Sequence, residues 1–288
     1  KIIGESSNRR LQLESGDLDI AENIPFDQLA AMANKPGVKV CEYPSLAVTY
    51  LYLNNKRAPI SSVEMRRAIS YAADYSGLIK SIMKGQAKQM RGAIPEGMWG
   101  FDASAMQYQL DMNKAKAELA KANPSRKKLS FLYSERDPNW EPIGLALQAN
   151  LASLGIDVKM ERMANATMRD RIGKGDYDIS IGNWSPDFAD PYMFMNYWFD
   201  SEKQGLPGNR SFYANAEVDK LVRQAASISD QKQRTKLYQQ AQKIVVAEAP
   251  YVFLFQKNYQ VAMRDSISGY VFNPMLENIF NIESMTKR

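Results

Sequence analysis

The sequence predicts an α/β protein, and three observations support this class. Between residues 128 and 183, strand-like and helix-like segments alternate in the order β-α-β-α-β. This order is typical of a parallel sheet with right-handed crossovers. Amphipathic helical patterns occupy residues 215–227 and 230–248. The chain has 288 residues, which is enough for two domains and a large core.

The elements before the alternating unit carry their own local signals. Gly16 stands where a helix would end, and Leu18 and Ile20 then alternate with acidic residues as in a short strand. Residues 49–54 form a strand pattern. Side-chain caps mark three further helix starts, at Ser61-Ser62-Val63-Glu64, at Asp74 and at Asp111.

The alternating unit and the C-terminal part complete the prediction. Strands are expected at 128–133, 156–160 and 177–183, with helices at 141–154 and 166–172. Gly155 ends the first of these helices. After the two amphipathic helices, residues 251–255 form an apolar strand, and 259–263 are a candidate for another.

The composition excludes several classes of site. The chain has no histidine, which rules out Ser-His and Cys-His nucleophile pairs and His-based zinc sites. Its single cysteine, Cys41, can form neither an intrachain disulfide nor a four-thiolate zinc site. An all-oxygen calcium or magnesium site stays open, although no Asp-x-Asp-x-Asp-Gly loop occurs. Neither glycine-rich nucleotide motif occurs.

Charge and hydropathy bear on partners and location. The net charge is +5, but basic residues are scattered among acids, and the longest basic cluster is Arg126-Lys127-Lys128. This distribution favours a solvated surface over a nucleic-acid-binding face. No apolar run approaches the ~20 residues that span a bilayer. The N-terminus does not resemble a signal peptide, so we expect either that none existed or that the front of the gene product is absent.

Two loops offer polar and aromatic groups at the same edge of the predicted sheet. One is residues 134–140, with Arg136 and Trp140, and the other is residues 184–191, with Trp184 and Asp187. Each follows a strand of the alternating unit, and ligands of open parallel sheets bind beyond the carboxyl ends of the strands. A carboxylate beside an indole suits a ligand ammonium, and it could equally be a catalytic acid.

Each of these candidate site residues could instead have a purely structural role. Asp187 could instead form the turn, and Trp184 could pack in the core at a strand end. Arg136 could hold a ligand carboxylate bidentately or simply be solvated. Asp190 before Pro191 is expected to shape the turn rather than touch a ligand. The aromatic residues of 192–199 and Cys41 are expected to pack in the core.

Ordered stretches over nearly the whole chain resemble the bacterial extracellular solute-binding proteins of family 5. The run Leu13-Glu14-Ser15-Gly16-Asp17-Leu18-Asp19-Ile20 is similar to the family's Ser-Gly-Glu-Ile-Asp-Ile-Ala segment. Residues 50–54, Pro59 and residues 63–74 resemble the family signature, and residues 94–100 resemble its Ile-Pro-x-Gly-Met-Trp-Gly motif. Residues 236–242 and 248–250 resemble its C-terminal helix and the start of the following strand.

The resemblance implies a periplasmic-binding-protein-like (type II) fold of two lobes. It assigns residues 51–251 to a complete second lobe, and residues 1–50 and 252–288 to remnants of the first. Family members carry a long segment before this region, so we expect a truncated product that lacks part of the first lobe. The interlobe crossings are expected at residues 50–53 and 251–255.

The resemblance also implies a function and a set of site residues. The protein would be a periplasmic, monomeric, non-enzymatic receptor that closes on a peptide and delivers it to the membrane permease of an ABC importer, with no metal, cofactor or nucleic acid. Asp187, three residues after Trp184, would bind the peptide ammonium, and Arg136 the carboxylate. Ser185 and Tyr133 complete the expected binding set.

Alternatives from the same family and from other classes remain open. Family members also take metal chelates, oligosaccharides and opine-like compounds. A glycoside hydrolase would need two carboxylates about 5 Å or about 6.5–9.5 Å apart across a cleft, and Asp187 and Asp190 lie on one loop. A nucleic-acid-binding module would need aromatic residues interleaved with basic ones along a strand, which does not occur here.

Overall fold

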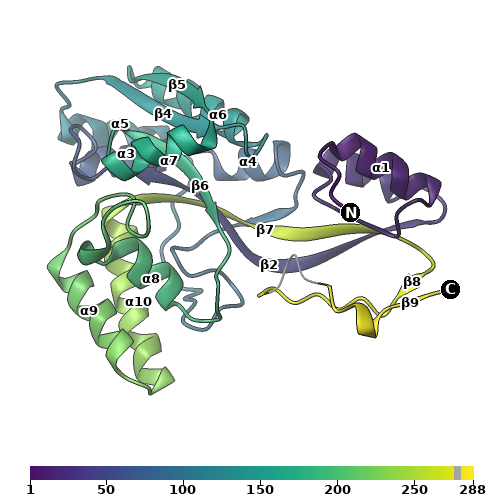
Figure 1. Ribbon diagram of the computed structural model, residues 1–288. Coiled ribbons are helices and arrows are strands. Elements are labelled where there is room, and N and C mark those ends of the chain that lie inside the picture. Colours follow the sequence, from purple (N-terminus) through teal and green to yellow (C-terminus); the bar gives the residue numbers. More distant parts are fainter. Residues whose placement is uncertain (276–279) are drawn as a thin grey trace.

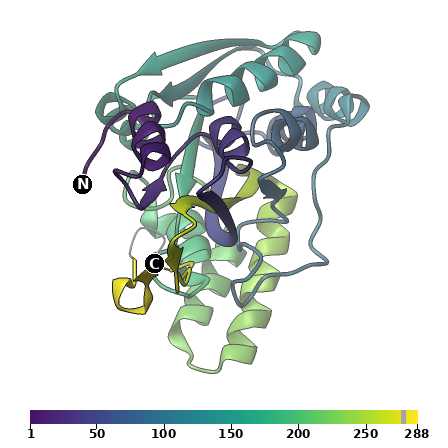
Figure 2. The same cartoon turned by 90° about the vertical axis from the view of Figure 1, so that its right-hand side faces the viewer.

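The computed structural model describes residues 1–275 and 280–288 and consists of a large α/β body and a narrower extension (Figure 1). Residues 276–279 of the expected return segment 252–288 lie outside the described residues. Both termini lie in the extension, as Figures 1 and 2 show. Among the described residues, no helix combines the length and apolar character needed to cross a bilayer.

One sheet runs through both parts of the molecule. Its strands are β1 (Ile20–Glu22), β2 (Val38–Leu53), β3 (Ala87–Gln89), β4 (Lys128–Ser134), β5 (Asp157–Met163), β6 (Ile179–Trp184) and β7 (Tyr251–Arg264). The order is β1-β7-β2-β6-β4-β5, with β3 also on β7. The pairs β4–β5 and β4–β6 are parallel, as predicted, whereas β1, β2, β3 and β7 pair antiparallel. The sheet is therefore mixed.

Helices cover the sheet in two groups (Figure 1). One group holds α3 (Val63–Ala72), α5 (Met112–Ala122), α6 (Trp140–Ser153) and α7 (Asn165–Lys174). On the opposite side lie α8 (Tyr192–Phe199), α9 (Ala216–Ser227) and α10 (Gln231–Glu248). The remaining elements are α1 (Ser6–Ser15), α2 (Phe26–Met32), α4 (Tyr75–Ser81), β8 (Ile267–Ser268), β9 (Thr286–Lys287) and the short 3-10 turns Ser201–Lys203 and Ile282–Ser284.

Local signals account for most element boundaries. Asp74 and Asp111 accept backbone hydrogen bonds at the starts of α4 and α5, as predicted. The cap of α3 is Ser62, one residue later than the first serine of the predicted capping box. Gly16 adopts φ 90° after α1, a conformation that glycine reaches without the steric cost of a Cβ atom.

The core of the large body is aromatic where β2 and β7 pair. Tyr50 lies 4.5 Å from Trp198 and 5.0 Å from Tyr251, measured between ring centroids. The phenol rings of Tyr50, Tyr52 and Tyr251 are almost completely buried. Such ring pairs add about 0.5–1.5 kcal/mol each beyond the area that they bury. The aromatic helix α8 is part of this core, as predicted.

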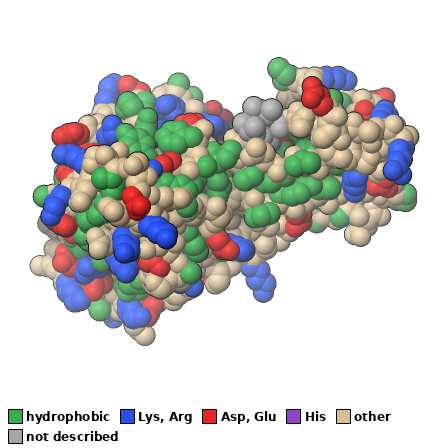
Figure 3. Space-filling model, turned by 90° about the horizontal axis from the view of Figure 1, so that it is seen from below, with side chains coloured by type: hydrophobic (Ala, Val, Ile, Leu, Met, Phe, Trp, Pro, Cys, Tyr) green, Lys and Arg blue, Asp and Glu red, His purple; other side chains and the backbone are tan. Residues whose placement is uncertain are grey.

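Two long strands join the extension to the body. Strand β2 pairs with β7 from Val38↔Arg264 to Tyr52↔Tyr251, with irregularities between Pro44 and Val48 and between Thr49 and Tyr50. Residues 50–53 and 251–255 belong to the core of the large body, so the expected crossings at these positions are wrong. Strands β2 and β7 both continue beyond these residues into the extension (Figure 1). Hydrophobic side chains lie along the face of the extension that Figure 3 shows.

Candidate functional site

The two predicted loops come together at one edge of the sheet. Strands β4 and β6 are parallel neighbours, with Phe131 opposite Ile179, so their carboxyl ends meet at the same edge. Arg136 from the first loop and Trp184 and Ser185 from the second line one cavity of about 440 Å³. The structure therefore brings these three predicted residues together at one cavity, and their role in binding stays a prediction.

Residues from the extension side also reach this cavity. Asn23 follows β1, and Lys257 lies on β7 where that strand leaves the body. A neighbouring cavity of about 700 Å³ shares Asn23, Arg136, Trp140 and Lys257 with it. The two cavities together form a cleft between the body and the start of the extension, which we call the sheet-edge cleft.

Trp184 forms part of the cleft wall. Its side chain is half-buried, and its indole Nε1 is buried without a hydrogen-bond partner among the described residues. The guanidinium carbon of Arg210 lies 5.9 Å from the indole ring, within the range of a cation–π contact. Trp140 is 3% exposed, and its Nε1 also lacks a partner in the described part of the chain.

The two carboxylates of the second loop have different surroundings. Asp190 pairs with Arg234, with both Nη atoms of the guanidinium 2.9 Å from carboxylate oxygens, and it accepts the backbone N–H of Tyr192. Its predicted role in shaping the turn is thus confirmed. Asp187 is exposed and makes no hydrogen bond or ion pair with residues 1–275 or 280–288. It does not line the 440 Å³ cavity but stands beyond Ser185 on the same loop.

The remaining predicted residues lie in contrasting positions. Arg136 is exposed, and its guanidinium pairs with no carboxylate of the described chain. Tyr133 is 5% exposed and donates a hydrogen bond to Glu141 Oε1 at 2.9 Å. Burial and this carboxylate raise the pKa of Tyr133. The structure does not bring Tyr133 to the cavity wall, because its hydroxyl turns toward α6.

Arg210 also lines the cavity, although it was not among the residues predicted from the sequence. Its Nη1 donates to the Tyr52 hydroxyl and its Nε to the Leu206 carbonyl, both at 2.8 Å. No motif marks this arginine, because it reaches the cavity only after residues 204–213 fold over β2. Asn209 stabilises that loop by accepting the backbone N–H of Tyr213 and donating to its carbonyl.

The charges around the 440 Å³ cavity are of one sign. Four cationic side chains line it, and no aspartate or glutamate among the described residues does; the four are Arg136, Arg169, Arg210 and Lys257. None of the four has a carboxylate within salt-bridge distance in the described part of the chain. Such a concentration of positive charge favours an anionic group of a ligand.

The neighbouring tyrosines are neutral partners. Burial raises the pKa of Tyr50 and of Tyr251 well above the ordinary value of 10.0. Their hydroxyls therefore stay protonated at physiological pH and add no negative charge near Arg210. The Tyr251 hydroxyl lacks a hydrogen-bond partner among the described residues.

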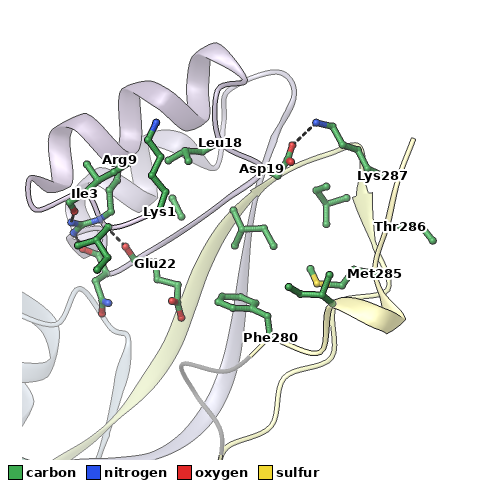
Figure 4. Close-up of a pocket in the computed structure, with 16 residues that line it drawn as sticks. Lys1, Ile3, Arg9, Leu18, Asp19, Glu22, Phe280, Met285, Thr286 and Lys287 are labelled. Carbon is green, nitrogen blue, oxygen red and sulfur yellow. Dashed lines mark hydrogen bonds and ion pairs between the residues drawn. The ribbon is translucent and has the colours of Figure 1, made fainter.

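A separate cavity of about 700 Å³ lies in the extension (Figure 4). Mostly apolar side chains from both ends of the chain line it, among them Leu18 and Phe280. Its charged residues include Asp19 and Lys287, which pair at 2.9 Å. Within residues 1–275 and 280–288, no three His, Cys, Asp or Glu side chains gather as metal ligands would. The sheet-edge cleft is therefore the candidate site.

Residues 1–205 match the family described as bacterial extracellular solute-binding proteins, family 5 middle. The chain belongs to this family. Its fold is that of the family's solved structures: it superimposes on a Helicobacter pylori periplasmic binding protein, DppA, in complex with the peptide STSA, with a TM-score of 0.85 and 28% identity. That superposition covers 97% of this chain and 56% of the other.

Curated relatives of this family 5 chain carry different ligand descriptions. The probable D,D-dipeptide-binding periplasmic protein DdpA of Escherichia coli strain K12 is 65% identical over 287 residues. The heme-binding protein A of Haemophilus influenzae is 27% identical over 278 residues. The chain spans about half the length of these relatives, 56% and 51% respectively. Both relatives are described as binding proteins.

Proposed function

We propose that the protein carrying this chain is a periplasmic receptor for short peptides, with D,D-dipeptides as the preferred class. It would hand the unmodified peptide to the membrane permease of an ABC importer. The observation that carries the proposal is the 65% identity, along the whole chain, to a relative described as binding D,D-dipeptides. The more distant heme-binding relative is a weaker guide because it shares only 27% identity.

The electrostatics of the sheet-edge cleft support a zwitterionic ligand. A dipeptide has a positive and a negative end. The 440 Å³ cavity offers a group of unpaired cations, and the free carboxylate of Asp187 lies two residues after Ser185 on the loop that borders this cavity. Asp187 would bind the ammonium, since no residue of the described chain neutralises it. The cationic cavity, which includes Arg136, would receive the carboxylate.

The walls of the cleft would exclude water around these charges. Trp184 supplies an apolar face, and Ser185 supplies a hydroxyl at the same wall. Closure over the ligand lowers the effective dielectric, which strengthens both ion pairs. In this arrangement charged groups recognise the two ends of the peptide, and the side chains of the peptide contact apolar surface that discriminates less between them.

The arrangement does not favour hydrolysis by two carboxylates. Asp190, the second acid of the loop, is held by Arg234 and by the backbone of α8. It would have to break these contacts before acting as an acid or base. A non-peptide anionic solute is the alternative within the family, and the cationic cavity is the observation that favours it.

Calorimetry with Asp187→Asn tests the peptide proposal. In the whole protein as the cell makes it, we expect D-alanyl-D-alanine to bind at least about tenfold more weakly to the variant, because the variant loses one member of a charge pair that closure over the ligand would bury. Asp170→Asn is the matched control, because Asp170 is an exposed acid paired only with Lys174 on its own helix. Unchanged affinity in Asp187→Asn would remove the ammonium role.

A further inference from the structure

Arg210 is held in place by groups that carry no charge. Its Nη1 donates to the hydroxyl of Tyr52, which is itself 1% exposed, and its Nε donates to the Leu206 carbonyl. The guanidinium carbon lies 5.7 Å from the Tyr52 ring and 5.9 Å from the Trp184 ring. These contacts fix the orientation of the guanidinium before any ligand arrives.

Two hydrogen bonds leave part of this guanidinium unsatisfied. Nη2 makes no hydrogen bond with the described residues. The buried Nε1 of Trp184 and the hydroxyl of Tyr251 lack partners too, and both line a narrow recess beside Arg210. Neither of these two buried groups accepts a hydrogen bond from Nη2, so the guanidinium keeps unused donors at the wall of the 440 Å³ cavity.

Four arginines of the large body are neutralised by carboxylates within the protein, whereas the buried Arg66 donates to backbone carbonyls. Arg126, Arg171, Arg223 and Arg234 each pair with an aspartate or glutamate at 2.6–2.9 Å. Arg210 has no such partner among the described residues, and the other cations of its cavity have none either. Removing a guanidinium from water without a counter-charge is unfavourable. A ligand carboxylate would relieve this cost.

Arg136 is less suited to be the main carboxylate receptor. It is exposed on a loop, where solvent screens its charge and where no hydrogen bond orients its guanidinium. Arg210 is half-buried, oriented and adjacent to the indole wall. A preorganised cation at low dielectric contributes more to binding than a mobile one in water.

We propose that Arg210 is the principal receptor for the carboxylate of the bound peptide, with the Trp184 indole as the adjoining wall. This inference rests on the proposed peptide-binding function. It assigns the specificity-determining contact to a residue from the loop between the Ser201–Lys203 turn and α9. In this assignment Arg136 is a secondary, solvent-exposed cation at the outer edge of the cleft.

The test compares D-alanyl-D-alanine with its C-terminal amide by calorimetry on the whole protein. The wild type should bind the free acid at least about tenfold more tightly than the amide. In Arg210→Met this preference should fall to within about threefold, because the amide removes a charge that the variant no longer recognises. Arg136→Met and Arg169→Met, two exposed cations of the same cavity, should keep most of the preference.

Arg210→Gln is a second variant for the case in which Arg210→Met does not fold. Glutamine removes the charge but keeps an amide donor near the position of the arginine Nε, which bonds the Leu206 carbonyl, and its thermal midpoint would be compared with that of the wild type. Full acid preference in either folded Arg210 variant would overturn the proposal. Loss of preference only in Arg136→Met would also overturn it while leaving peptide binding intact. A wild type that binds neither the acid nor the amide would refute the peptide function and this inference together.

Discussion

The Arg234 guanidinium binds the Asp190 carboxylate through both of its Nη atoms, each 2.9 Å from an oxygen. The pair joins the loop after β6 to helix α10. Both side chains are largely buried, with Asp190 20% and Arg234 17% exposed. Asp187, three residues earlier, has no comparable partner among the described residues. One loop thus carries one structural carboxylate and one that is free for a ligand.

We expect Asp190→Asn to lower the free energy of unfolding by about 1–3 kcal/mol, between the values typical of exposed and of buried ion pairs. Asparagine can still accept the Tyr192 N–H but cannot neutralise Arg234. Urea denaturation would measure the loss. Asp187→Asn is the matched control and should change stability by less than about 0.5 kcal/mol. Equal losses in the two variants would contradict the division of roles.

Asp178 should make the stability depend on pH in the acid range. Its side chain is 2% exposed and receives Arg126, Arg57 and the backbone N–H of Ser130. Burial alone would raise the pKa of this carboxyl, but the hydrogen bonds from Arg126 and Ser130 outweigh burial and lower it. Its stabilisation is therefore complete above the unfolded pKa of about 3.9 and is lost as pH falls through the lower folded value.

Asp178→Asn should accordingly cost about 2–3 kcal/mol at pH 7. This is less than for a fully buried pair because both arginines are about 40% exposed. Urea midpoints recorded from pH 5 to pH 2 should fall less steeply in the variant than in the wild type. Asp170→Asn, an exposed acid, should follow the wild type. Parallel curves for wild type and Asp178→Asn would show that Asp178 does not contribute.

Gly182 couples the core to the candidate site. A Cβ atom there would lie 2.3 Å from the Tyr52 hydroxyl oxygen, which accepts the Arg210 hydrogen bond. Gly182→Ala should therefore displace Tyr52, destabilise the fold by about 1–3 kcal/mol and reduce the acid-over-amide preference. Gly4→Ala meets nothing within 4 Å and should alter neither. Normal preference in Gly182→Ala would show that Tyr52 does not orient Arg210.

Tyr213 joins the segment before α9 to the C-terminal end of α10. Its hydroxyl donates to Glu248 Oε2 at 2.7 Å, and burial and this carboxylate raise its pKa. Tyr213→Phe should lower the free energy of unfolding by about 1.5–3 kcal/mol, the range for a hydrogen bond to a charged group. Tyr192→Phe removes a hydroxyl without a partner in the described chain and should cost less than about 0.5 kcal/mol. A similar cost at both positions would argue against the Glu248 contact.

The unit from β4 to β6 shows how far local patterns predict this fold. Its strands and helices lie within a few residues of their expected positions, because capping, apolar periodicity and glycine stops depend on neighbours in the sequence. The parallel pairing of β4 and β6 followed from the crossover rule and placed Arg136 and Trp184 at one cavity.

The length of strand β2 could not be predicted from local sequence patterns. Only residues 49–54 had a strand pattern, yet β2 begins at Val38. The additional residues pair with β7, more than two hundred positions later in the chain. Half-exposed residues and Pro44 do not show the regular alternation of a strand. The crossings between body and extension were predicted at residues 50–53 and 251–255 for the same reason, because the long pairing of β2 with β7 is not visible in local sequence patterns.

The sequence by itself determined the α/β class, the crossover unit, the family and the loop that carries Trp184 and Asp187. Only the tertiary structure decided that Arg234 neutralises Asp190, that Tyr133 turns away, and that Arg210 joins the cationic cavity. The physical reason is distance along the chain. Helix and strand signals act over a few residues, whereas Asp190 and Arg234, or Tyr52 and Arg210, are far apart in the sequence and interact only after the chain has folded. The direction of the Tyr133 side chain depends in turn on where α6 packs, because Glu141 of that helix accepts its hydrogen bond.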